Sequence, residues 1–429
     1  MESYITLLRE NANYRSLWLG AVVSQLGDWF NLIASASLIA TLTDSGAAIS
    51  YLFLGRFLPL FFFSPFAGVI ADRFDRRRIL ILTDVLRALT VLGFLLVRDP
   101  QHVWLFYLLT VTQFALSAIF NPARTSIIAN IVDEEDLVTA NALDSFTWST
   151  MLAVGSLLGG IAAAALGIGA AFAIDAFTFL GAAWFISRVD VPERLVEARA
   201  TASQGGWLDF LDGLRYLRGQ PYILVVSLVK GGGSLVWGAI NVLEVNFAEQ
   251  IFPLRGGGEA TLGVIYAITG LGTGFGPLLL RRWLGDTPRR LLWAMTAGFW
   301  VLALGILGLS AAPTLPWFGL ATLVRTVGSG AVWVFSAALL QMVVPDRFRG
   351  RVFAFEFAVL TLTQSLSIFW AGFAQDTLQW SVRQVTAGMG VCGLVVGLLW
   401  FLFHLFLLSR PALPTSLTPL SRRSPRSVS

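Results

Sequence analysis

Charged residues are scarce in this sequence. Only 13% of its 429 residues are Asp, Glu, Lys or Arg, whereas 56% are hydrophobic, and the mean hydropathy is +0.72. Soluble domains are about 25% charged, so this composition excludes a protein that stays in solution. Three stretches, 145–174, 291–324 and 384–409, contain no Asp, Glu, Lys or Arg at all. Each exceeds the roughly 20 residues that a helix needs to cross a bilayer. Because lipid offers the backbone no hydrogen-bond partner, we predict an all-α membrane protein.

Residues that carry out chemistry are also few. The chain has one cysteine, Cys392, two histidines, His102 and His404, and one lysine, Lys230, and none of them has partners at the spacing of a metal or catalytic site. No ATP-binding loop precedes the lysine, and "GLGTGFG" (270–276) does not fit the dinucleotide pattern Gly-x-Gly-x-x-Gly. We therefore expect no enzymatic activity and no cofactor. The net charge of +4 does not indicate a nucleic-acid partner, because the arginines lie between apolar stretches, where they orient membrane spans.

Twelve apolar stretches are long enough to span a membrane, and the joins between them alternate in arginine content. The expected spans are 16–42, 47–71, 79–97, 103–129, 137–165, 168–188, 222–249, 260–281, 290–310, 315–343, 351–375 and 384–408. The joins after the second, sixth, eighth and tenth spans hold fifteen arginines, against three in the other joins. Because basic loops stay in the cytoplasm, this bias predicts that both termini are cytoplasmic.

The longest join divides the spans six and six. Its end, "GWLDFLDGLRYLRGQP", has apolar residues at helical spacing, which is typical of a helix lying in the membrane interface. A shift of 212 residues lays "RRRIL" (76–80) near "PRRLL" (288–292), a faint sign of duplicated halves. The start has mixed charges and no cleavage site, so we expect the first span to insert uncleaved. The expected organisation is an N-terminal six-helix bundle (1–190), a cytoplasmic linker with an interfacial helix (191–221), a C-terminal six-helix bundle (222–410) and a disordered cytoplasmic tail (411–429).

A compact group of charges follows the second span. In "GVIADRFDRRRIL" (68–80), six ionised side chains fall within seven residues, 72–78, which we call the charged loop. The stretch resembles the loop motif of the major facilitator superfamily, Gly-x-x-x-Asp-Arg-x-Gly-Arg-Arg, with Asp75 where the family has glycine. "NYRSLWLGAVVSQLGDWF", "FNPARTSIIANIV", "TANAL" and "AIDAFTFL" extend the resemblance, which looks like the branch of macrolide-efflux and siderophore-export proteins. The residues that match the loop motif are Gly68, Asp72, Arg73, Arg76, Arg77 and Arg78.

The resemblance implies two pseudo-symmetric six-helix bundles, the major facilitator fold, and transport by alternating access. The charged loop is then a cytoplasmic gate, in which Asp72 pairs with an arginine or a helix N-terminus and the arginines reach Asp84 or the acidic run 133–136. A surface ion pair is worth only about 0–1 kcal/mol, so a gate needs several. The alternative is that these arginines only fix the topology and bind anionic lipid headgroups.

A glycine-rich stretch in the fifth span bears on the direction of transport. "GSLLGG" (155–160) resembles the superfamily's antiporter motif Gly-Pro-x-x-Gly-Gly, with Ser156 in place of proline. Gly155, Gly159 and Gly160 would let helices approach closely. Plain helix packing explains these glycines about as well.

Charges inside the expected spans are the candidates for coupling or substrate binding, because charge in a membrane is costly. Asp28 and Asp175 fall near the midplane, and Arg56, Lys230, Arg325 and Glu356 lie at intermediate depth. Asp28 is the preferred proton carrier, followed by Asp175 and Glu356. The alternative is a structural role for Asp28 and Asp175, paired with polar neighbours.

Together these features predict a secondary active transporter of the cell membrane, acting as a monomer among membrane lipids. We expect proton-coupled efflux of an amphipathic small molecule, such as a drug, a macrolide or a siderophore-like compound. The alternatives are a uniporter or symporter of another small organic solute, and a receptor or scaffold that transports nothing.

Overall fold

The computed structural model describes residues 2–43, 45–190, 213–254, 257–284 and 287–408. Within these residues the secondary structure is helical apart from one isolated bridge between Leu254 and Gly257. Eleven helices are long and apolar enough to cross a membrane, and a twelfth helix of 32 residues, α2, packs beside them against α8. The prediction of an all-α membrane protein with twelve spans is therefore confirmed.

The helices match the expected spans closely. The N-terminal half consists of a short helix α1 (Glu2–Glu10), then α2 (Ala12–Thr43), α3 (Gly46–Arg73), α4 (Arg76–Gly93), α5 (Val103–Ile131), α6 (Leu137–Thr150), α7 (Ser156–Leu166) and α8 (Ile168–Ile186). The C-terminal half consists of α11 (Pro221–Asn246), α12 (Glu259–Leu284), α13 (Pro288–Ala311), α14 (Leu315–Val343), α15 (Asp346–Asp376) and α16 (Val382–Leu408).

The fifth span differs from the continuous helix that we expected. A π-helical turn, Met151–Gly155, separates α6 from α7. Such turns often mark functional positions in helices, and this one contacts α12 of the other half. The short helix α1 was also not predicted.

Local sequence explains several helix ends. Ser45 accepts a hydrogen bond from the backbone N–H of Ala48 and so caps α3. Asp75, the residue that departs from the family motif, accepts one from the backbone N–H of Arg78 at 2.8 Å and caps α4. A glycine is required at the turn between α7 and α8, where Gly167 has a φ of +88°.

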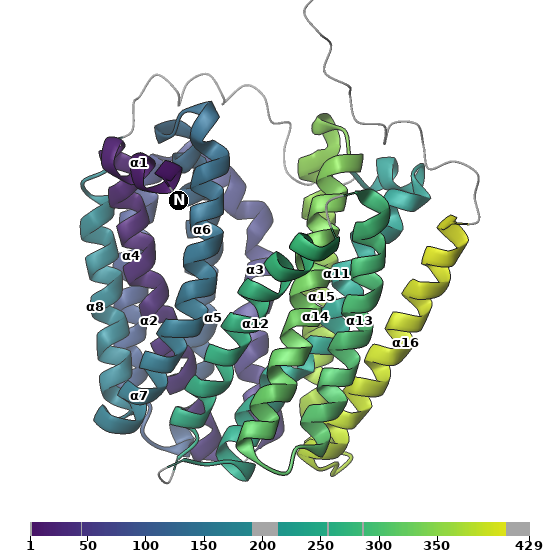
Figure 1. Ribbon diagram of the computed structural model, residues 1–429. Helices are drawn as coiled ribbons and strands as arrows, with labels where there is room; N and C mark the ends of the chain where they lie inside the picture. The colour runs from purple at the N-terminus through teal and green to yellow at the C-terminus, as the bar shows by residue number, and fades with distance from the viewer. Residues whose placement is uncertain (1, 44, 191–212, 255–256, 285–286, 409–429) are drawn as a thin grey trace, which may run out of the picture.

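The two halves form separate bundles that meet at one end. In Figure 1 the halves lie close together at the end opposite the N-terminus, which we call the distal end, and farther apart at the N-terminal end. The main contacts between halves are those of α3 with α15 and of α7 with α12. Large apolar side chains such as Leu89 and Phe177 are exposed on the bundle surface, as expected for helices that face lipid.

Most of the predicted interfacial helix and the whole predicted tail, 411–429, lie outside the described residues. The described end of the linker, 213–218, is helical. Its Tyr216 stacks on Phe348 of α15, with ring centroids 4.1 Å apart, and Leu217 is buried. This end of the linker is therefore attached to the C-terminal half.

Candidate functional site: charges within the helices of the two halves

Arg87 is the centre of a buried charge cluster in the N-terminal half. Its Nη2 atom lies 3.1 Å from Asp28 Oδ1 on α2, and its Nη1 atom lies 3.3 Å from Asp84 Oδ1 one turn earlier on α4. Its guanidinium also lies over the ring of Phe179, 4.0 Å from the centroid. The Arg87 side chain is 6% exposed and Asp84 is fully buried, but Asp28 is 32% exposed. One carboxylate of the cluster is thus accessible and the other is enclosed.

This arrangement differs from two sequence-based expectations. Asp84 was expected as a partner of the charged loop, but its ion pair is with Arg87, and it has no other charged partner in the described part of the chain. Asp28 is held by Arg87 rather than by uncharged polar neighbours. Arg87 itself was not among the predicted site residues.

Arg56, on α3, is held differently from the other deep cations. Its Nη1 atom donates to Asn31 Oδ1 at 3.4 Å, and its guanidinium lies over the ring of Phe114, 4.4 Å from the centroid. No carboxylate in the described residues forms an ion pair with it. Arg56 is therefore a cation with only uncharged contacts.

Asp175, on α8, is fully buried where α8 meets α2. Its Oδ1 atom accepts a weak hydrogen bond of 3.4 Å from Thr178 Oγ1, and its Oδ2 atom has no partner in the described part of the chain. A Cβ atom on Gly27 of α2 would lie 2.4 Å from this carboxyl, so glycine allows the close approach. Asp175 is enclosed, unlike Asp28.

Two further ion pairs lie inside the C-terminal half. Lys230 Nζ, on α11, lies 3.0 Å from Glu356 Oε2 on α15, and the ammonium sits 4.7 Å from the ring centroid of Trp333. Arg325, on α14, pairs with Glu244 on α11. Each of these four side chains is at most 8% exposed. These two pairs therefore tie helices of one half together.

At the distal end a carboxylate of the C-terminal half binds the start of a helix of the other half. Asp376, at the end of α15, accepts hydrogen bonds from Ser45 Oγ at 2.5 Å, from Gly46 N at 3.0 Å and from Ala47 N at 3.2 Å. These donors form the N-terminus of α3, whose partial positive charge favours an anion. Asp376 thus caps a helix of the other half.

Glycines bring the halves into backbone contact nearby. A Cβ atom on Gly160 would lie 2.9 Å from Gly263 Cα of α12, and one on Gly372 of α15 would lie 2.8 Å from Ala47 Cα of α3. Within "GSLLGG", Gly155 faces Trp29 and Gly159 faces Phe30 of α2. The predicted helix-packing motif thus lies where α7 contacts α12 and α2.

The charged loop connects α3 and α4 at the N-terminal end of the bundle. Arg77 donates to the backbone carbonyl of Ser187 just after α8, which ties the loop to its own half. The side chains of Gly68, Asp72 and Arg73 lie outside the described part of the structure. The gate prediction for this loop is therefore untested.

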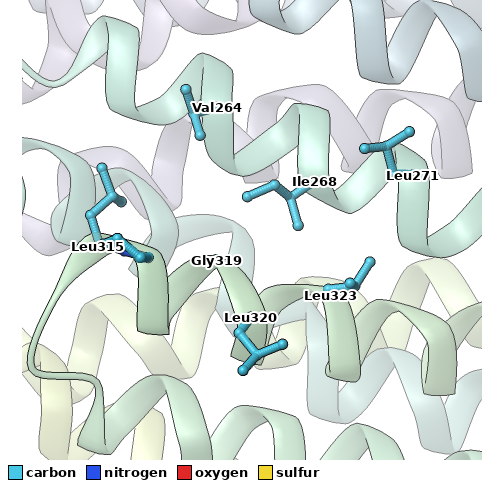
Figure 2. A pocket seen from close by; sticks show the side chains of 8 residues that line it. Val264, Ile268, Leu271, Leu315, Gly319, Leu320 and Leu323 are labelled. Carbon is cyan, nitrogen blue, oxygen red and sulfur yellow. The ribbon is translucent and has the colours of Figure 1, made fainter.

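A pocket of about 430 Å³ lies between α12 and α14 (Figure 2). The residues that line it are Val264, Ile268, Leu271, Leu315, Pro316, Gly319, Leu320 and Leu323. None of them has a polar side chain, so the pocket has no side chain that could bind a charged or polar solute. The charged residues within the helices of the two halves therefore define the candidate site.

Comparison with known proteins identifies the class. Residues 17–368 match the Major Facilitator Superfamily. The chain is 26% identical over 395 residues to an uncharacterized MFS-type transporter, YfiS, of Bacillus subtilis (strain 168), covering 89% of this chain and 91% of that protein. It is 22% identical over 376 residues to macrolide efflux protein A of Streptococcus pyogenes, covering 85% and 90%.

A solved structure supports the same fold. The crystal structure of the nucleoside transporter NupG superposes with a TM-score of 0.74 at 12% identity, over 91% of this chain and 99% of that one. The chain belongs to the Major Facilitator Superfamily. It is a multi-pass membrane transporter, and its family and structural relatives are transporters rather than enzymes.

Proposed function

We propose that this transporter exports an amphipathic small molecule in exchange for protons, by alternating access. The two halves, 1–190 and 222–410, would rock about a site between them and act as a monomer in the cell membrane, with both termini in the cytoplasm. Export is supported by the similarity to macrolide efflux protein A over most of both chains. The arginine bias supports the orientation.

The observation that carries the proposal is the accessible carboxylate of Asp28. It lies near the middle of α2, is 32% exposed, and is paired with a cation that is almost fully buried. A carboxylate in this position has access to protons and can neutralise a substrate cation. Asp175 and Glu356, by contrast, are enclosed by protein.

The pairing of Arg87 explains how Asp28 can lose its charge. Removing the only charged partner of a buried cation destabilises the folded protein by about 3–5 kcal/mol. Arg87 has a second carboxylate in Asp84, at 3.3 Å. After protonation of Asp28, Arg87 would thus still be paired with Asp84. Asp28 could then exchange its proton for a substrate.

With the termini in the cytoplasm, the distal end faces outside the cell, and the present conformation is closed to the outside. The outer contacts would then be those of Asp376 with α3, together with the hydrogen bond from Ser37 to Glu259 of the other half at 3.0 Å. Opening to the outside would break them. The charged loop would close the cytoplasmic end in that second state.

The test is efflux driven by an imposed pH gradient. A compound-susceptibility panel in cells with and without the protein first identifies a substrate, and purified protein in liposomes then measures its uphill movement. Collapse of the pH gradient should stop accumulation. Uphill movement that survives collapse would exclude proton coupling, and equilibration without accumulation would favour the uniporter alternative.

The proposed orientation makes its own prediction. In a Cys392→Ser background, Gln204→Cys should react with a membrane-impermeant maleimide only after the cells are opened, because the linker would lie in the cytoplasm. A cysteine at Gln101, in an expected outer join, is the matched control and should react in intact cells. Labelling of position 204 from outside would overturn the topology.

A second prediction concerns the charged loop. Asp72→Asn removes one charge and nearly keeps the shape of the side chain, so expression and membrane insertion should be normal. Transport should fall by up to about fivefold, because one surface interaction of the closed cytoplasmic end, worth up to about 1 kcal/mol, is lost. Asp99→Asn, in an expected outer join, is the control. Normal transport by a well-expressed Asp72→Asn variant would mean that the charged loop fixes the orientation of the spans and does not act as a gate.

A further inference from the structure

Asp28 and Arg56 present open polar atoms of opposite charge in the same region. Asp28 Oδ1 accepts from Arg87, but Oδ2 has no partner among the described residues and is not enclosed. Arg56 uses Nη1 on Asn31, while its Nε and Nη2 atoms have no described partner and are likewise not enclosed. Asn31, which accepts from Arg56 at 3.4 Å, lies one turn after Asp28 on α2, and no ion pair between Asp28 and Arg56 is found in the described residues.

The other deep cations of the spans are already neutralised. Arg87 pairs with two carboxylates, Lys230 pairs with Glu356, and Arg325 pairs with Glu244. A charge in a membrane is costly and is normally paired or placed along a substrate pathway. Arg56 has no such pair among the described residues, so it is a candidate for contact with a charged ligand.

Aromatic residues surround this region from both halves. Phe114 of α5 lies against the Arg56 guanidinium. Trp29 of α2 approaches Tyr266 of α12, with ring centroids 5.9 Å apart, across the boundary between the halves. The hydroxyl of Tyr266 is buried without a described partner. Asp28, the residue before Trp29, thus lies on the part of α2 that meets α12.

We propose that the site binds a small zwitterion with an apolar body. Its ammonium group would be held by Asp28 Oδ2, its carboxylate would accept hydrogen bonds from Arg56 Nε and Nη2, and its apolar body would lie against the aromatic rings. The inference rests on the proposed export function and narrows its substrate class. An ammonium group and a proton would then compete for the same carboxylate, which is the requirement for exchange of one against the other.

The test is a binding series with one scaffold and three charge patterns. The probes are leucyl-leucine, which is zwitterionic, N-acetyl-leucyl-leucine, which is an anion, and leucyl-leucinamide, which is a cation. Binding to the purified full-length protein is measured by tryptophan fluorescence and by isothermal titration calorimetry. Leucyl-leucine should bind about tenfold or more tightly than either singly charged form, because each lacks one charge-assisted interaction.

Variants assign the two ends of the ligand. Arg56→Gln should reduce the affinity for leucyl-leucine to that for leucyl-leucinamide, and Asp28→Asn should reduce it to that for N-acetyl-leucyl-leucine. Arg98→Gln, in an outer join, should change neither. Equal affinities for the three probes, the absence of binding by folded protein, or an Arg56→Gln variant that still prefers the zwitterion would overturn the inference. If the zwitterion fails to bind but proton-driven efflux of another compound is measured, the inference on substrate class is wrong and the proposed export function still holds.

Discussion

Asp28→Asn should abolish uphill efflux while leaving the protein folded and inserted. Asparagine keeps the shape of the side chain but cannot exchange a proton, and Arg87 keeps its contact with Asp84. With one proton exchanged per neutral substrate, a pH difference of one unit sustains about a tenfold concentration ratio, since both are worth about 1.4 kcal/mol. In the variant this ratio should fall to about one, with downhill movement as the only remaining flux.

Asp144→Asn is the matched control for this prediction. Asp144 pairs with Arg124 at 2.8 and 2.9 Å and is 19% exposed, but it lies outside the cluster around Arg87. The Asp144→Asn variant should retain uphill efflux in liposomes under the same pH gradient. Accumulation by Asp28→Asn at the wild-type level would instead move the proton to Asp175 or Glu356.

Asp376→Ala should shift the transporter toward the conformation that is open at the distal end. The substitution removes three hydrogen bonds to α3, two of them from the backbone of its first turn. Each hydrogen bond to a charged group is worth about 1.5–3 kcal/mol. The loss of even one would change the ratio of the two conformations about tenfold or more.

Spin labels can measure this shift. Leu166→Cys at the end of α7 and Thr314→Cys just before α14 lie at the distal end of different halves, and a Cys392→Ser background leaves only these two sites. Electron–electron resonance should show a longer distance in Asp376→Ala than in the parent. Asp99→Ala removes a distal carboxylate whose ion-pair partner in the described part of the chain is His102 of its own half, so it should leave the distance unchanged. An unchanged distance in Asp376→Ala would mean that this carboxylate does not hold the halves together.

The sequence was sufficient to predict the helices because their signal is local. An apolar stretch long enough to cross the bilayer has to be helical whatever surrounds it, and every expected span has its counterpart among the helices. The π turn at Met151–Gly155 lay beyond prediction, because it depends on contacts with α12 rather than on local composition. The family motif likewise pointed to the fold before any helix packing was known.

The site was predictable only in part because its contacts join distant segments. Expected depth in the membrane was the one signal for the charged candidates, since charge in a span is costly. These candidates include Asp28, Arg56, Lys230, Arg325 and Glu356. Their partners were not predicted, although the spacing of Asp84 and Arg87 at i and i+3 on one helix was a usable signal for that pair. Asp376 and Gly46 are 330 residues apart in sequence, and no local pattern links them.

The central claim is that substrate and proton are exchanged at Asp28. The most direct test is to measure the proton movement that a substrate gradient drives. Liposomes containing the transporter are loaded with a confirmed substrate and a pH-sensitive dye, and are then diluted into substrate-free buffer of the same pH. Substrate leaving down its gradient should draw protons in, so the lumen should acidify with the wild-type protein and stay at constant pH with Asp28→Asn. Exit of substrate through the wild-type protein without any change in luminal pH would contradict the account.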